Sequence, residues 1–203
     1  QLKEDLPFQY AYPNPYIKSQ QMAEEIIQDT FKTDNEWKIA LLRLGNIAGA
    51  FEHGVLGEMV PPLPKNIVPL AMQVGARQRE FIELRKQAQT EDKTVERSFL
   101  HVLDCCEAVS LTLQWLFQQQ HVCEAFNIAG EAISIQQLLN EISSVTGTEI
   151  KTVDAHVYPY AELDQVAADI SKAKEVLGWQ PKRSIQQMLE DEWRFYQHTL
   201  RGQ

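Results

Sequence analysis

The sequence predicts an α/β fold, in which helices alternate with the strands of a parallel sheet. Apolar residues recur at helical spacing from Tyr16 to about Phe31, which indicates a helix. The next segment, WKIALLRL at residues 37–44, is a short apolar run typical of a buried parallel strand. Gly45 and Gly49 follow it. A helix, a strand and a glycine-rich turn in this order are characteristic of α/β proteins.

The segment at residues 45–69 differs from the rest of the chain. It holds four of the nine glycines and four of the nine prolines, and it has little periodicity. A loop of this length inside a compact domain is usually functional or disordered. After it we expect a helix over residues 66–78, a short strand FIELR, a polar hairpin or loop KQAQTEDKTVER, and a strand-like run SFLHVLD.

The second half of the chain has clearer helix signals. A helix is expected to begin at Asp104 and run to about residue 119, and the strand AFNIAG follows it. A Ser-x-x-Gln capping box at Ser134 begins the next helix, which Gly147 ends. A second box of this type at Ser184 opens the last helix.

Composition limits the kinds of partner. The chain has 203 residues, of which 44% are hydrophobic, enough for one good core or two small ones. The formal charge of -9 argues against binding of nucleic acid, which requires a basic stripe. No apolar run is long enough to cross a bilayer, so no membrane partner is expected. The acidic, mixed N-terminal residues resemble neither a secretory signal nor a transit peptide.

The metal-ligating residue types do not form a recognisable site. The three cysteines are an odd number with two adjacent, a pattern that fits neither a disulfide framework nor a zinc site: Cys105, Cys106 and Cys123. The five histidines are scattered without ligand spacing. We therefore expect no metal site, and reduced thiols in a cytoplasmic protein.

Tyr16 is the first candidate for chemistry. A phenol with an ordinary pKa near 10 is a weak base at neutral pH, and a cation one helical turn away would lower that pKa. A lysine at i+4 would supply this cation, but Gln20 stands there and Lys18 lies at i+2 on another side of the helix. Tyr16 is thus either a proton-transferring residue or a packing residue at a helix start.

Arg97 and the glycine-rich loop form the second candidate. Arg97 precedes an apolar strand, a position from which a guanidinium can grip a phosphate with two hydrogen bonds. Asn46 and Asn66 in the loop offer donors and acceptors to the same ligand. The alternative is a solvated arginine paired with one of the nearby carboxylates: Glu91, Asp92 or Glu96.

Several separate stretches resemble the UDP-glucose 4-epimerases, which are extended short-chain dehydrogenases/reductases of the NAD-dependent epimerase/dehydratase family. NPYIKSQ is similar to that family's N-P-Y-G-K-S/T-K segment, and LLRLGNIAGAFEHGVLGE to its L-L-R-Y-F-N-P-x-G-A stretch. LPKNIVP, TEDKTVERSFLHVLD, FNIAG and ADISKAKEVLGWQP match further family segments. Their order is the family's order and their spacing is nearly constant, from about Glu4 to the C-terminus.

The resemblance implies a role for each matching residue. Tyr16 occupies the place of the tyrosine that exchanges a proton with the sugar 4-hydroxyl and lies at the cofactor, and Gln20 replaces its lysine partner. The remaining matches imply contacts with the nucleotide sugar, through its diphosphate, sugar or uracil: Asn46, Asn66, Ile67, Ile82, Leu84 and Arg97. Counting back from Ser171, Pro159 stands where the family has a second phosphate-binding arginine. Val166 falls at the position that limits the pocket for an N-acetyl group.

The resemblance also implies an organisation into two parts. Residues 1–49 and 97–131 would belong to a Rossmann-type nucleotide-binding domain, and residues 50–96 and 132–203 to a small α/β substrate domain. No G-x-G-x-x-G or G-x-x-G-x-x-G occurs in the sequence, so we expect a C-terminal portion that does not bind NAD alone.

The implied function is NAD-dependent 4-epimerisation of a UDP-hexose, either UDP-glucose/UDP-galactose or an N-acetyl form, in galactose metabolism. The chain alone is expected to be inactive. The alternative is a catalytically degenerate relative or fragment that binds a nucleotide sugar or a partner protein without turnover. Relatives of this type dimerise through the tyrosine-bearing helix and the next one, so a homodimer is compatible with the sequence.

Overall fold

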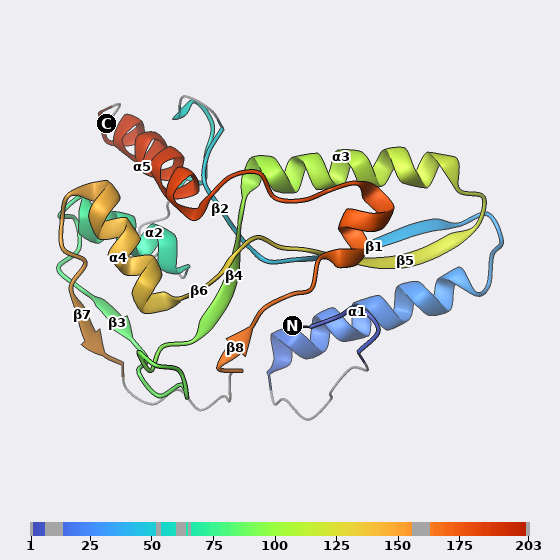
Figure 1. Cartoon of the computed structure of the whole chain (residues 1–203), viewed down its shortest axis with the longest axis horizontal. Coiled ribbons are helices and arrows are strands. Elements are labelled where there is room, and N and C mark those ends of the chain that lie inside the picture. The colour runs from blue at the N-terminus through green and yellow to red at the C-terminus, as the bar shows by residue number, and fades with distance from the viewer. Residues whose placement is uncertain are drawn as a thin grey trace.

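The computed structural model describes residues 2–6, 14–51, 54–59, 64, 66–155 and 163–201. Within these ranges the chain is a mixture of helices and mainly parallel strands (Figure 1), which confirms the predicted α/β class. Pro159 lies outside the described residues.

One part of the molecule is built on a pair of long parallel strands. β1 (Lys38–Leu44) pairs with β5 (Val122–Ile128) over its whole length. α3 (Val102–Gln118) and α1 (Pro15–Phe31) lie on opposite sides of this pair in Figure 1. None of the residues of α1 is buried, whereas α3 buries part of its surface.

The other part contains short strands covered by three helices. β4 (Glu96–His101) pairs with β2 (Asn46–Ala48) and β8 (Gln165–Val166) in parallel, and with β6 (Ala132–Ser134) in antiparallel orientation. β3 (Ile82–Leu84) and β7 (Thr152–Asp154) form a separate parallel pair. The helices that pack here are α2 (Ile67–Gly75), α4 (Ile135–Thr146) and α5 (Ile185–Arg201).

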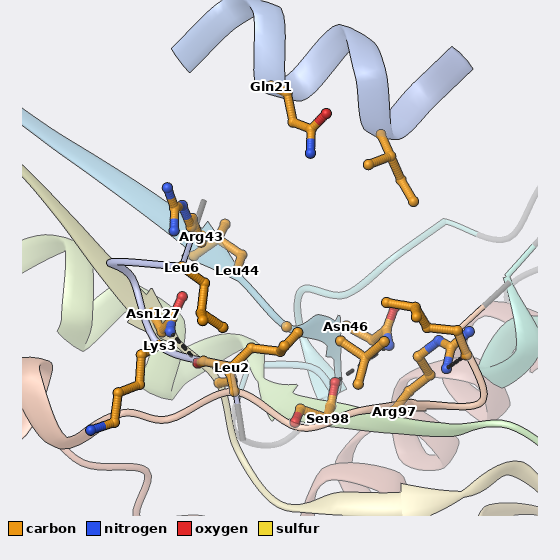
Figure 2. Close-up of a pocket in the computed structure, with 16 residues that line it drawn as sticks. Leu2, Lys3, Leu6, Gln21, Arg43, Leu44, Asn46, Arg97, Ser98 and Asn127 are labelled. Atoms are coloured by element: carbon orange, nitrogen blue, oxygen red, sulfur yellow. Dashed lines mark hydrogen bonds between the residues drawn. The ribbon is translucent and has the colours of Figure 1, made fainter. Parts of the chain in front are cut away.

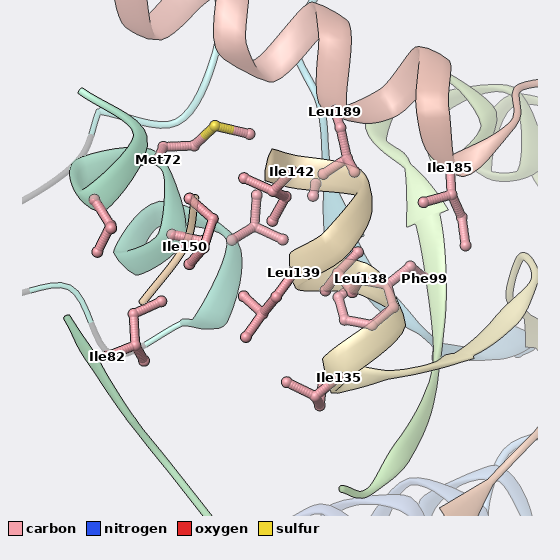
Figure 3. Close-up of a cluster of buried hydrophobic side chains, with 14 of the residues drawn as sticks. Met72, Ile82, Phe99, Ile135, Leu138, Leu139, Ile142, Ile150, Ile185 and Leu189 are labelled. Atoms are coloured by element: carbon pink, nitrogen blue, oxygen red, sulfur yellow. The ribbon is translucent and has the colours of Figure 1, made fainter. Parts of the chain in front are cut away.

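Each part has its own hydrophobic cluster. The larger cluster lies between α2, α4, α5 and β4 (Figure 3) and includes Phe99, Leu138 and Leu189. The smaller one gathers residues of β5, α3 and a π-helical turn (Ala173–Leu177) around Trp179. β4 serves both clusters because successive strand residues point to opposite faces: Phe99 belongs to the larger cluster and Leu100 to the smaller.

Helices α2, α4 and α5, which lie in the predicted substrate domain, all contribute to the larger cluster. However, Ala173, Leu177 and Trp179 pack with β5 and α3, although they lie within residues 132–203. The assignment of the two domains remains a prediction of the sequence.

The junction between β4 and α3 is a buried polar centre. His101 is 2% exposed and Asp104 is fully buried. The Asp104 carboxylate accepts hydrogen bonds from the backbone N–H groups of Lys182 and Arg183 and from Nη1 of Arg183, at 3.1, 2.9 and 2.6 Å. Its backbone carbonyl accepts from Trp179 Nε1 at 3.0 Å. These contacts anchor the chain that leads into α5.

His101 connects the same junction to α5. Its Nδ1 accepts the backbone N–H of Leu103 at 3.0 Å, so the proton of the neutral ring is on Nε2, which faces Asp191 Oδ2 at 3.3 Å. Burial lowers the pKa of His101 more than the hydrogen bond to Asp191 raises it. α3 therefore begins at Val102 with His101 as its N-cap, two residues before the predicted start at Asp104.

Two glycines allow the chain to cross between the two parts. Gly45 joins β1 to β2, and an ideal Cβ there would lie 3.1 Å from the Ser98 carbonyl oxygen. Gly130 joins β5 to β6, and its Cβ would lie only 2.1 Å from the carbonyl oxygen of Phe99. Only glycine fits Gly130 without a shift of the backbone, because the obstructing atom belongs to the main chain of β4.

We predict that Gly130→Ala destabilises the protein by about 3 kcal/mol, because the new methyl group forces β4 and β6 apart. Thermal or urea unfolding would measure the loss. Gly147→Ala is the matched control: Gly147 has φ +67° but nothing lies within 4 Å of its Cβ, so only backbone strain of about 1–2 kcal/mol is expected. Equal losses in the two variants would contradict the steric explanation.

Candidate functional site

A cavity of about 670 Å³ opens where β1 and β5 end and β2 and β4 begin (Figure 2). Its walls come from the N-terminal segment, α1, the crossing at Gly45 and the segment around β8. The polar side chains that line it are Lys3, Gln21, Arg43, Asn46, Arg97, Ser98 and Asn127. The apolar ones include Leu2, Leu6, Ile17, Leu44, Leu163 and Val166. The lining combines cations, amides and apolar surface.

Asn46 and Arg97 are two of the predicted ligand-binding residues, and the structure brings both to this cavity. They lie on neighbouring strands, since β2 and β4 pair in parallel with Asn46 opposite Phe99. Asn46 Nδ2 donates to the Ser98 carbonyl at 3.4 Å, a long and weak hydrogen bond that a ligand could replace. Val166, the predicted pocket-size position, also lines the cavity.

Backbone carbonyls hold the guanidinium of Arg97. Its Nη1 donates to the carbonyl oxygens of Glu96 and Leu163, each at 2.8 Å. Both acceptors are neutral backbone groups. Leu163 lies near Arg97 because Val166 pairs with Arg97 in the parallel β4–β8 ladder. The cationic side chain of Arg97 thus lies at the cavity wall, where backbone carbonyl oxygens hold its Nη1.

Arg43 is a functional candidate that the sequence reading did not single out. Its Nε and Nη2 make a two-pronged ion pair with the Glu24 carboxylate at 2.9 and 2.8 Å, and its Nη1 donates to the Glu4 carbonyl at 3.0 Å. These bonds attach α1 and the N-terminal segment to β1, on one side of the cavity. The available signal was a single arginine inside the apolar run LLRL.

Asn127 has a similar positioning role, and it was also not singled out. The side chain is 5% exposed, and its Nδ2 donates to the carbonyls of Leu2 and Asp169 at 2.9 and 3.1 Å. Its backbone N–H donates to Glu4 Oε1 at 2.8 Å. Asn127 therefore fixes the N-terminal segment across the end of β5.

Tyr16 lies beside the cavity instead of in its wall. It is 71% exposed at the start of α1, where Asn14 Oδ1 accepts its backbone N–H at 3.0 Å. α1 presents Ile17 and Gln21 to the cavity, one residue beyond Tyr16 and Gln20 respectively. Gln20 is also exposed. The catalytic and cofactor-binding role of Tyr16 remains a prediction.

The other predicted ligand residues are not among those that line the cavity. Asn66 is exposed at the N-terminus of α2, where its side chain makes no capping hydrogen bond, and Ile67 packs partly against the larger hydrophobic cluster. Ile82 and Leu84 are 2% and 6% exposed in that same cluster. The predicted contact of these residues with the nucleotide sugar also remains a prediction.

The described residues contain no group of three or more His, Cys, Asp and Glu side chains that could hold a metal ion. Within the same ranges, no helix is both long and apolar enough to span a membrane. Cys105 is buried, Cys106 is exposed and Cys123 is intermediate.

Comparison with known proteins identifies the family. The family model described as GDP-mannose 4,6 dehydratase matches residues 1–192. The chain belongs to this family. It is an epimerase-like extended short-chain dehydrogenase/reductase that corresponds to the C-terminal portion of its relatives, as the motifs predicted.

Curated relatives of the chain include UDP-glucose 4-epimerases. The enzyme of Bacillus subtilis (strain 168) is 31% identical over 203 residues, 99% of this chain and 59% of the relative. UDP-glucose 4-epimerase 4 of Oryza sativa subsp. japonica is 32% identical over 182 residues, 89% of this chain and 49% of the relative. The chain thus spans about half the length of these relatives.

Solved structures agree on the fold. The UDP-glucose-4-epimerase from Stenotrophomonas maltophila, with bound NAD and formylated UDP-arabinopyranose, superposes on the whole chain with a TM-score of 0.91 at 25% identity, over 60% of its own length. The Bifidobacterium longum enzyme, in complex with NAD+ and UDP, also gives 0.91 over 60% of its length, at 24% identity. The predicted Rossmann-type architecture is therefore confirmed.

We predict that Arg43→Met loosens α1, because the change leaves the Glu24 carboxylate without its two-pronged partner. A loss of about 1–2 kcal/mol in the free energy of unfolding is expected, since the pair is partly exposed. Hydrogen exchange of the α1 amides should also accelerate. Lys32→Ala breaks the exposed ion pair with Asp29 and should change neither measurement. Unchanged α1 exchange in Arg43→Met would contradict this role.

Proposed function

We propose that the cavity between the two parts binds the diphosphate and sugar of a UDP-hexose. In this proposal the intact protein is an NAD-dependent nucleotide-sugar 4-epimerase. The observation that carries it is the meeting of Asn46 and Arg97, from neighbouring strands, in one cavity of a chain that belongs to an epimerase/dehydratase family.

The charge distribution supports an anionic ligand. The protein carries a formal charge of -9, yet Lys3, Arg43 and Arg97 line the cavity and none of its lining residues among those described is acidic. Three of the lining side chains are therefore cations, and one of them, Arg43, pairs with Glu24. A local reversal of charge in an acidic protein concentrates negative ligands at that point.

The size and apolar lining suit the remainder of such a ligand. A volume near 670 Å³ is within the range of about 300–1,000 Å³ for small-molecule sites. Leu44 and Ile17 supply apolar surface for a sugar face, and Asn46 and Gln21 supply amide donors and acceptors.

The residues of this chain do not by themselves form a site for the NAD pyrophosphate. Such a site requires a glycine-rich turn at a helix N-terminus, and the sequence has no G-x-G-x-x-G or G-x-x-G-x-x-G. In an epimerase of this family NAD supplies the hydride acceptor and donor at the sugar C4. The part proposed for this chain is Tyr16, which would exchange the proton of the 4-hydroxyl.

A second candidate function is binding of a nucleotide sugar without turnover. Gln20 favours it, because a neutral amide replaces the cation that would assist proton transfer by Tyr16. The position of Tyr16 outside the cavity lining favours it as well. In the main proposal the substrate is UDP-glucose/UDP-galactose or an N-acetyl form. The protein is then a cytoplasmic enzyme of galactose metabolism, and it forms a homodimer.

We predict that UDP raises the melting temperature of this chain, because a ligand that binds only the folded state stabilises it by mass action. Arg97→Ala should weaken UDP binding by about tenfold or more, the effect of losing a charge-assisted contact. Lys32→Ala, remote and exposed, should bind UDP like the wild type. No stabilisation of either this chain or the intact protein by UDP or UDP-glucose would exclude the proposed ligand.

We predict that Gln20→Lys increases the rate of UDP-galactose to UDP-glucose conversion by the intact protein with NAD. The restored cation favours deprotonation of Tyr16, and a gain of about 100-fold is expected if its loss cost a few kcal/mol. Met22→Lys, at an exposed position of the same helix outside the cavity lining, is the matched control. Activity absent from both the wild type and Gln20→Lys, together with normal UDP binding, would support the binding function instead.

A further inference from the structure

Glu192 on α5 is a buried carboxyl group outside the candidate cavity. The residue is 1% exposed, and its Oε2 accepts the backbone N–H of Gly49 at 2.9 Å. Gly49 comes directly after β2, in a left-handed conformation with φ +88°. The contact joins residues that are 143 positions apart in the sequence and connects the glycine-rich loop to the last helix.

The loop lies against α5 at two further glycines. The Gly54 carbonyl oxygen and His198 Nδ1 are 3.1 Å apart, which identifies the protonated Nδ1 as the donor. An ideal Cβ on Gly57 would lie 2.6 Å from the ring of Phe195. The Cβ position of Gly49 lies 3.0 Å from His101 ring atoms and 3.2 Å from Met188 Cγ on α5. The described loop residues and α5 are therefore in contact at Gly49, Gly54 and Gly57.

The groups around Glu192 offer little compensation for a negative charge. The partner of its carboxylate is a neutral amide. Glu58 from the loop adds a like charge, and Asp191 precedes it on α5. His101, on the other side of Gly49, is kept neutral by burial, and Arg194 pairs with Asp191. The described residues that face this position thus favour an uncharged carboxyl.

Burial is the largest influence and raises the pKa of Glu192 from 4.5 to about 7; the charge of Glu58 acts in the same direction, and the Gly49 hydrogen bond opposes them. A raised pKa stabilises the docked loop fully below pH 4.5, and this stabilisation is lost as the pH rises through about 7. The two protonation states of Glu192 are therefore both accessible near neutral pH.

We propose that Glu192 is a pH-sensitive latch, which in its neutral form holds the described residues after β2, 49–51 and 54–59, against α5 and in its ionised form releases them to water. Gly49 comes three residues after Asn46, whose side chain lines the cavity, so the latch acts on the backbone next to that amide. Only this last link rests on the proposed function. Docking of the loop itself is independent of any ligand.

The direct test measures hydrogen exchange at the Gly49 amide by NMR between pH 6 and 8, divided by the intrinsic rate at each pH. The latch predicts that the opening constant rises by about tenfold over this interval. Glu192→Gln keeps an oxygen that can accept the Gly49 N–H but cannot ionise, so its opening constant should not change with pH. Glu190→Gln, at an exposed position on the same helix, is the matched control and should behave like the wild type.

Glu58→Gln provides a second, independent test, because this exposed substitution does not alter the core. Removing this exposed charge should move the midpoint of the Gly49 transition to lower pH, because it reduces the repulsion that favours the neutral carboxyl. A Gly49 opening constant in the wild type that does not change between pH 6 and 8 overturns the latch. A transition that persists in Glu192→Gln overturns it as well.

A final measurement connects the latch to the cavity. The dissociation constant for UDP should increase between pH 6 and 8 in the wild type more than in Glu192→Gln. If the exchange transition occurs and UDP does not bind at any pH, the latch stands and the proposed function fails. If UDP binds with the same pH dependence in both proteins, the connection between latch and ligand is wrong.

Discussion

A buried polar junction between β4 and α3 ties the C-terminal part of the chain to the rest of the fold. Asp104 is fully buried and would destabilise the fold strongly if it lacked partners. Three N–H groups from Lys182 and Arg183 satisfy it, and His101, three residues earlier, reaches Asp191 on α5. Because these partners come from the last quarter of the chain, the C-terminal helix must return to β4, where the two hydrophobic clusters meet.

This junction also explains where the cavity lies. β4 reaches His101 at its buried end, and its opposite end carries Arg97 into the cavity. The chain at Gly45, after β1, and at Gly130, after β5, passes close to the backbone carbonyls of Ser98 and Phe99 on the same strand. A ligand held by Arg97 and Asn46 would therefore contact β4, the strand that both clusters share. Gly49, three residues after Asn46, is in turn bonded to Glu192 on α5.

Side-chain direction separates the predicted site residues that line the cavity from those that do not. Asn46 and Arg97 were expected near one ligand, and they line one cavity. Ile82 and Leu84 alternate along a strand whose other side is Glu83, so both point into the core. Tyr16 and Gln20 lie one position away from Ile17 and Gln21, the residues that α1 turns to the cavity. A motif does not reveal which of two adjacent helix residues faces a cavity, because the orientation of the helix about its axis depends on what packs against it.

The sequence alone determined the fold class, the family motifs and the ends of helices whose signals are local, such as the capping box at Ser134 and the glycine at Gly147. These features depend on neighbours within a few residues. The tertiary structure decided the pairing of Arg43 with Glu24, the early start of α3 at Val102 and the contact of Gly49 with Glu192. Each of these features depends on residues that only packing and burial bring together. An unpaired charge costs free energy only when it is buried away from water, so the local sequence does not reveal which charges must be paired.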